Sequence, residues 1–154
     1  MADYRTPTPP THWMLVNTPE NFERTRGLVF SIQGMKARHG KKAGRMRPGD
    51  RILYYLTGLK AFAATATVTS PRFADSSPVW HSEKKGETYP WRVRIGPAVV
   101  PPPGRLVPAD ELAPFMEHVR KWPAEHWLLA FQGNVHEIPA ADFRLVEERL
   151  QLLC

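Results

Sequence analysis

The sequence contains a single cysteine, Cys154, which is its last residue. One thiol excludes an internal disulfide framework and a zinc site built from several thiolates, and a chain end is a poor position for a catalytic cysteine. No run of apolar residues approaches the roughly 20 that a membrane-spanning helix needs. The first residues are rich in proline and threonine and lack the apolar centre of a secretory signal. We therefore expect a cytoplasmic protein without a membrane partner.

The sequence also lacks the motifs that position catalytic groups, metals and cofactors. Its histidines do not pair at metal-site spacing, and no HExxH or HxH motif occurs. A P-loop, a GxGxxG turn and a GxSxG nucleophile motif are absent as well. We therefore predict a non-enzymatic protein with no metal and no cofactor. Two alternatives stay open: a small metal-independent nuclease or hydrolase that uses His39 or His81 as a base, and a protein-interaction domain that uses the Pro-rich stretches.

Length and charge point to one basic domain. At 154 residues the chain is long enough to bury a sizeable core. We predict a flexible N-terminal arm over residues 1–11 and a single domain over residues 12–154. With 21 basic against 15 acidic residues, the formal net charge is +6 and the pI is near 9.8. This balance favours nucleic acid as the partner.

The positive charge is concentrated in one stretch. Residues 36–47 hold seven lysine, arginine or histidine side chains and no acidic one. Cations without carboxylates among them repel one another in water, so the stretch is best explained by contact with a polyanion. A solvated charged surface is the alternative. The side chains that we expect to contact phosphates are Lys36, Arg38, Lys41, Lys42 and Arg45.

The apolar pattern predicts a mixture of short strands and helices. We expect strands over residues 12–17, 28–32, 51–56, 61–69, 91–95 and 135–138. A short helix should follow Thr18 as its N-cap and end at Gly27, and the last third should be mostly helical, with an amphipathic helix over residues 139–153. The strands are too closely spaced for regular βαβ units. The sequence therefore predicts an α+β fold built on a twisted antiparallel β-barrel.

Several stretches, taken in order, carry a family resemblance. They are the opening strand with Trp13, FSIQGMKARHGK, GDRILYYL, EHWLLAFQGNVHEIP and a closing helix that contains Asp-Phe. Their order and spacing over residues 12–153 resemble the EVE domain family, which belongs to the PUA-like superfamily and is related to YTH domains. The resemblance implies a curled β-barrel with flanking helices. It also implies a pocket for a flipped, often modified, nucleobase of DNA or RNA.

The chemistry of such a pocket favours aromatic walls. Extruding a base costs a few kcal/mol of unstacking, which stacking on aromatic side chains offsets at roughly 1–3 kcal/mol per base. The pocket residues that we predict are Trp13, Ser31, Gln33, Gly34, His39, Tyr54, Tyr55, Trp80 and Trp91. Core packing is the alternative for the tryptophans and tyrosines on strands, and a turn contact is the alternative for the short polar side chains.

Overall fold

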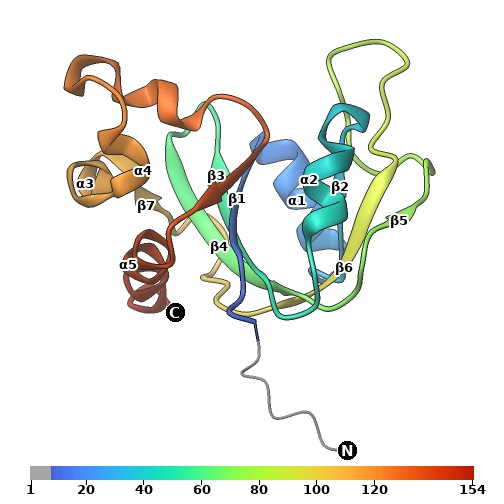
Figure 1. Ribbon diagram of the computed structural model, residues 1–154, viewed down its shortest axis with the longest axis horizontal. Helices are drawn as coiled ribbons and strands as arrows, with labels where there is room; N and C mark the ends of the chain where they lie inside the picture. The colour runs from blue at the N-terminus through green and yellow to red at the C-terminus, as the bar shows by residue number, and fades with distance from the viewer. Residues whose placement is uncertain (1–7) are drawn as a thin grey trace, which may run out of the picture.

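A curled sheet forms the centre of the computed structural model, which describes residues 8–154 (Figure 1). Six strands follow one another across it in the order β2 (Ile32–Met35), β6 (Trp91–Pro97), β4 (Ala61–Val68), β3 (Arg51–Leu56), β1 (His12–Asn17) and β8 (Val135–Ile138). Two short strands extend it, because β5 (Phe73–Ala74) pairs with β6 and β7 (Val107–Pro108) pairs with β4. Residues 1–7 of the predicted N-terminal arm lie outside the described residues.

The sheet is mixed, and the predicted α+β fold on a curled barrel is confirmed with one correction. Within residues 8–154 the strand pairings are antiparallel except that of β1 with β3, which is parallel. The parallel pair follows from the long connection between the two strands, since a parallel neighbour needs a crossover of a dozen residues or more. That crossover carries β2, which pairs with β6 at the other end of the strand order, and the basic stretch, whose Arg45 lies 5.4 Å from the ring of Trp13 in β1.

Helices cover both faces of the sheet. One set comprises α1 (Pro19–Gly27), the 3-10 turn η1 (Ala37–His39) and α2 (Gly40–Arg45), which lie between β1 and β6 in Figure 1. The other set comprises α3 (Ala109–Leu112), η2 (Ala113–Phe115), α4 (Glu117–Arg120), η3 (Ala124–Phe131) and α5 (Ala140–Gln151), on the opposite side of β3 and β4. Each set closes its own apolar cluster against the sheet. None of the described helices is long and apolar enough to cross a lipid bilayer.

The first helix forms as predicted, and the strand expected after it does not. Thr18 caps α1 by accepting a hydrogen bond from the amide of Asn21 at 3.1 Å, and Pro19 occupies the first turn. After Gly27 the chain turns through left-handed backbone angles at Val29 and Phe30, with φ of 55° and 50°. Residues 28–31 are therefore a turn that folds Phe30 back into the core, and β2 begins only at Ile32.

The alternation along β3 sends its two tyrosines to different clusters. Ile52 and Tyr54 pack with α1 and α2, whereas Leu53 and Tyr55 pack on the opposite face with the C-terminal helices. The two adjacent tyrosines therefore lie in different packing layers. Both are buried, however, at 0% and 3% exposure.

Candidate functional site

A polar hollow of about 490 Å³ opens where β1 ends and α1 begins. Four stretches that are distant in sequence wall it together with Thr57: residues 16–21, Lys36 and Arg38, the loop of residues 81–89, and residues 131–134. The volume lies within the range of about 300–1,000 Å³ that is common for small-molecule sites. We call this cavity the polar hollow, and it is the candidate functional site.

The end of β1 places an unpartnered hydrogen-bond donor in the wall of the polar hollow. Asn17 follows four buried residues of the strand, and Thr18 then starts α1. The Nδ2 atom of Asn17 is buried, and it has no hydrogen-bond partner within the part of the chain that the structure describes. A buried amide without an acceptor costs about 1–3 kcal/mol. A ligand that presents an oxygen or an unprotonated ring nitrogen there would remove this cost.

Asn21, in the first turn of α1, fixes the loop of residues 81–89. Its Oδ1 accepts a hydrogen bond from the amide of His81 at 2.8 Å, and its Nδ2 donates to the carbonyl of His81 at 2.8 Å and to the hydroxyl of Tyr89 at 3.1 Å. Tyr89 consequently stands in the wall of the polar hollow. Burial raises the pKa of the Tyr89 hydroxyl, which keeps the ring neutral.

An ion pair crosses one side of the polar hollow. Lys36 Nζ lies 3.2 Å from Glu87 Oε1, and the hydroxyl of Ser82 donates to the same carboxylate. The hydrogen bond from Ser82 and then the ammonium of Lys36 hold the pKa of Glu87 below its ordinary value. The hollow thus contains a carboxylate acceptor as well as amide and ammonium donors.

Asn134 joins the basic stretch to β1. Its Oδ1 accepts a hydrogen bond from Arg38 Nη2 at 2.6 Å and lies 3.2 Å from His39 Nε2, while its Nδ2 donates to the carbonyl of Val16 at 3.4 Å. Burial lowers the pKa of His39, and the charges of Arg38 and its neighbouring lysines lower it further. His39 therefore supports the wall through Asn134 as a neutral imidazole near pH 7.

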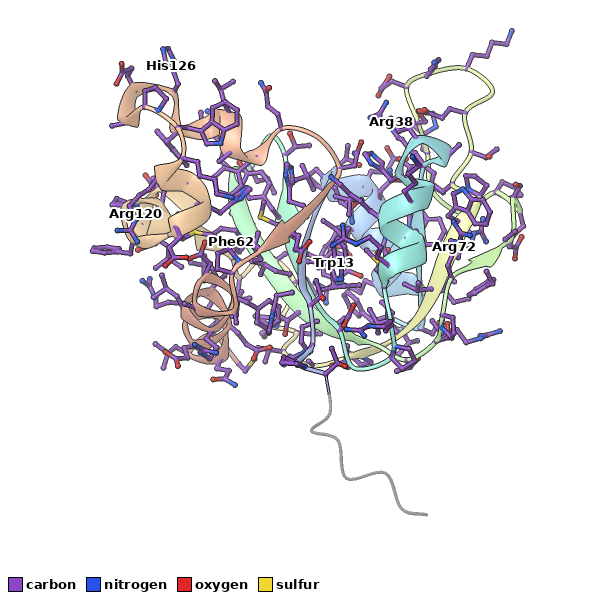
Figure 2. All side chains as sticks on the ribbon, in the orientation of Figure 1. Trp13, Arg38, Phe62, Arg72, Arg120 and His126 are labelled. Carbon is purple, nitrogen blue, oxygen red and sulfur yellow. The ribbon has the colours of Figure 1, made fainter. Side chains whose placement is uncertain are left out.

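Three of the aromatic residues predicted for the pocket lie in the core, which corrects that assignment. Trp13 and Tyr54 have no exposed surface, and Figure 2 shows Trp13 in the middle of the molecule. The indole of Trp13 donates to Asp50 Oδ2 at 3.0 Å, so its polar group is satisfied without a ligand. Tyr55 stacks on Phe131 with ring centroids 4.4 Å apart. It therefore lies behind Phe131, which is the residue that reaches the hollow.

Trp80 and Trp91 are placed differently from the core aromatics. Trp80 is 7% exposed, donates from Nε1 to Thr25 Oγ1 at 2.9 Å and packs behind Tyr89, with ring centroids 5.9 Å apart. Gly34 makes this position possible, because a Cβ there would lie 2.3 Å from the Trp80 ring. Trp91 is half-buried at the start of β6, where it pairs with Met35 of β2 and Ala74 of β5, and it does not line the polar hollow.

The short polar candidates, Ser31 and Gln33, make local contacts. Ser31 is exposed and its hydroxyl donates to the carbonyl of Leu28 at 2.6 Å. Gln33 is buried, and its Oε1 accepts a hydrogen bond from the hydroxyl of Tyr54 at 2.8 Å. Neither side chain lines the polar hollow, because one belongs to the turn after α1 and the other points into the core.

The cations predicted to contact phosphates are partly used within the protein. Lys42 Nζ donates to the carbonyl of Val135 at 2.7 Å, and Arg45 Nη2 lies 2.7 Å from Glu137 Oε2. Lys41, by contrast, is exposed and has no carboxylate within 4.0 Å among residues 8–154. The stretch has no acidic residue in its sequence, but the fold brings two carboxylates to it from other parts of the chain, Glu87 to Lys36 and Glu137 to Arg45.

Sequence reasoning named Lys36 and Arg38, which line the polar hollow, and missed most of the other residues that build it. Asn17, Asn21, Tyr89 and Asn134 all contribute to it, and none was predicted as a site residue. One signal was available. Two polar residues, Asn17 and Thr18, directly follow a buried strand, and strand ends are where binding residues gather on a rigid scaffold. Among residues 8–154, no group of three or more metal-ligating side chains is arranged to hold a metal ion.

A curled mixed sheet with helices on both faces and a hollow at its strand ends is the architecture of the PUA-like class. The YTH domain of the Zygosaccharomyces rouxii MRB1 protein, solved in complex with N6-methyladenosine RNA, superposes with a TM-score of 0.66 at 14% identity, over 97% of this chain and 92% of that one. The human THYN1 protein, solved in complex with 5-methylcytosine-containing DNA, gives a TM-score of 0.59 at 12% identity, over 92% and 98%. At these identities the likeness concerns the fold.

The family follows from the sequence itself. The EVE domain model matches residues 11–149, and the chain therefore belongs to the EVE domain family. A UPF0310 protein of Pyrococcus abyssi is 24% identical over 149 residues, which cover 91% of this chain and 99% of that protein. A second UPF0310 protein, from Pyrococcus horikoshii, is 26% identical over 152 residues, with the same coverage.

Proposed function

We propose that this protein binds nucleic acid by taking a flipped, modified nucleobase into the polar hollow. The protein is proposed to be a binding module and not an enzyme. Asn17 carries the proposal, because it lines the polar hollow and its buried Nδ2 has no hydrogen-bond partner within residues 8–154, so an acceptor on a ligand would satisfy it. The edges of nucleobases present such acceptors. Two structural relatives with nucleic acid bound, one with methylated RNA and one with methylated DNA, support the class of ligand.

The composition of the walls suits a flat, polar ring. Tyr89 offers an aromatic face, Asn17 offers a donor, and Glu87 offers an acceptor to an exocyclic amine. One added methyl group contributes only about 0.8 kcal/mol when it is buried, which is roughly a four-fold preference. Selectivity for a modified base would therefore rest on the shape of the polar hollow and not on methyl burial alone.

Calorimetric titration with nucleosides tests the proposal directly. The panel consists of N6-methyladenosine, 5-methylcytidine and their unmodified parents. We expect a modified nucleoside to bind better than its parent, and Asn17→Ala to weaken that binding by roughly 5- to 30-fold, the value of one buried hydrogen bond of about 1–2 kcal/mol. Gln151→Ala, an exposed amide at the end of α5, is the matched control and should bind as the wild type does.

Two results would contradict the proposal. The first is equal affinity for modified and unmodified nucleosides, since the hollow would then not read a modification. The second is an Asn17→Ala protein that binds as tightly as the Gln151→Ala control, since the ligand would then lie elsewhere.

A further inference from the structure

Arg72 is held in a fixed orientation on the outside of α2. Its guanidinium carbon lies 4.1 Å from the centroid of the Trp91 ring, and its Nη1 donates to the carbonyl of Gly40 at 2.8 Å. Glycines let the helix approach Trp91 and Arg72 closely. A Cβ on Gly40 would lie 2.8 Å from Trp91 Nε1, and one on Gly44 would lie 3.2 Å from Arg72 Nη1. The N–H donors of a guanidinium lie in its plane, and among residues 8–154 only Nη1 of Arg72 donates a hydrogen bond, to Gly40.

Arg72 belongs to a group of uncompensated cations. No carboxylate lies within 4.0 Å of Arg38, Lys41 or Arg72 among residues 8–154. Arg38 and Lys41 lie within one turn of each other, and Arg72 hydrogen-bonds the residue that precedes Lys41. We call these three residues the α2 cation group. Figure 2 shows Arg38 at the upper end of the helix and Arg72 beside it.

The α2 cation group is continuous with the polar hollow, because Arg38 belongs to both. Three cations that repel one another without internal carboxylates match a polyanion. An oriented guanidinium matches a phosphate in particular, since its parallel N–H groups bind two phosphate oxygens together. The partner that fits is a chain of phosphates that starts at the hollow and crosses α2.

We propose that Arg72, with Arg38 and Lys41, binds the sugar–phosphate backbone of a strand whose base occupies the polar hollow. The inference rests on the proposed function and narrows it, because the ligand becomes a strand of several nucleotides and not a free nucleoside. Arg72 contributes a backbone contact that is independent of which base is bound.

The test measures binding of a fluorescein-labelled single-stranded oligonucleotide at several KCl concentrations, by fluorescence anisotropy. Each phosphate contact to a single strand contributes about 0.7 to the slope of log affinity against log salt. We expect Arg72→Gln to reduce the magnitude of the slope by about 0.7 and to weaken binding roughly ten-fold at low salt, as the loss of one charge-assisted hydrogen bond would. Nucleoside affinity measured by calorimetry should not change.

Two variants control for charge and for folding. Arg120→Gln removes an exposed arginine from α4, on the opposite side of the molecule in Figure 2, and should leave the slope unchanged. Arg72→Lys keeps the charge and should keep the slope. A thermal melt of each variant shows that α2 is still folded.

Each outcome decides the inference. Equal slopes for Arg72→Gln and Arg120→Gln would overturn it, and so would a wild-type protein that binds the oligonucleotide no more tightly than the nucleoside. In that second case base recognition in the polar hollow would stand without the strand contact. Conversely, a slope that depends on Arg72 without any preference among bases would support the strand contact and remove the proposed reader function.

Discussion

At the scale of single residues, Asp50 explains why Trp13 is a core residue. The carboxylate is 1% exposed and accepts three hydrogen bonds, from the Trp13 indole at 3.0 Å, the Thr11 amide at 3.0 Å and the Arg47 amide at 3.1 Å. A buried indole needs an acceptor for its N–H. Asp50 supplies this acceptor and lies 37 residues away in the sequence. The sequence around Trp13 therefore does not show that the indole N–H has a hydrogen-bond partner.

Removing this acceptor should destabilise the protein strongly. Asp50→Ala leaves three donors in a buried place without a partner, and we expect the free energy of unfolding to fall by about 4 kcal/mol. Urea unfolding monitored by tryptophan fluorescence measures the loss of stability. We expect a lower urea concentration at the midpoint, with an unchanged dependence of the free energy of unfolding on urea concentration. Asp110→Ala, an exposed aspartate in α3, is the control and should unfold at the wild-type midpoint. An equally stable Asp50→Ala protein would show that the three donors find other acceptors.

The residue scale is also where the sequence-based expectation and the structure differ most. The sequence around Trp13 and Tyr54 does not distinguish a core residue from a pocket residue, because an aromatic side chain on an apolar strand is common in both places. Ser31 looked like a base-reading hydroxyl on a strand, but the left-handed backbone at Val29 and Phe30 makes it part of a turn. Such placement depends on contacts across the fold and not on local pattern.

At the scale of elements, the loop of residues 81–89 depends on α1. The amide of one side chain, Asn21, makes three hydrogen bonds to His81 and Tyr89 and thereby fixes an otherwise irregular stretch against the first turn of the helix. The loop in turn supplies Tyr89 and Glu87 to the polar hollow. The long irregular stretch between β5 and β6 thus has a defined position without regular secondary structure.

Releasing the loop should affect binding more than stability. In Asn21→Ala we expect faster amide hydrogen exchange over residues 81–89 and loss of nucleoside affinity, while the free energy of unfolding changes by less than about 2 kcal/mol. Hydrogen exchange with mass spectrometry locates the change. Glu23→Ala, which breaks only the exposed pair with Arg26 on the same helix, should leave exchange in the loop as it is. Exchange that accelerates throughout the protein would mean that Asn21 supports the core instead.

Elements were predicted more reliably than contacts between them. The Thr18 cap, the strand over residues 51–56 and the closing amphipathic helix all follow from local pattern, and each is present in the structure. The basic stretch was recognised as acid-free, but its carboxylate partners lie in other elements, with Glu137 92 residues from Arg45. Local pattern describes the stretch correctly and cannot show which cations the fold neutralises.

At the scale of the whole molecule, the protein should become less stable as the pH falls below neutral. Burial is the largest cause that lowers the pKa of His12, His39 and His136, and the pKa of His136 falls from 6.5 to about 4. Below pH 6.5 the unfolded chain binds protons at these histidines that the folded chain does not bind. The free energy of unfolding therefore falls as the pH drops from about 6.5 towards 4.

Thermal melts at pH 7.5, 6 and 5 measure this dependence. We expect the melting temperature to fall with pH in the wild type, and to fall less in His136→Gln, which removes the most strongly shifted histidine. His126→Gln changes an exposed histidine, labelled in Figure 2, and should follow the wild-type profile. A His136→Gln protein with the same profile as His126→Gln would place the acid sensitivity on other groups.

The overall fold was the most predictable level. The order of short motifs in the sequence predicted the EVE domain family and its fold. The match of the family model over residues 11–149 confirms the family, and the curled sheet confirms the fold. The parallel pairing of β1 with β3 could not be read from the strands themselves, since parallel and antiparallel neighbours have the same alternation of side chains.

The four walls of the polar hollow come from both ends and the middle of the chain, with Val16 and Asn134 joined across 118 residues. No excised peptide of this protein would reproduce the cavity, so any compound that occupies it recognises only the folded form. By mass action such a compound raises the melting temperature by an amount that grows with the logarithm of the ratio of its concentration to its dissociation constant. A thermal-shift screen of a nucleotide library would therefore find compounds that bind the folded protein without any prior guess at their identity.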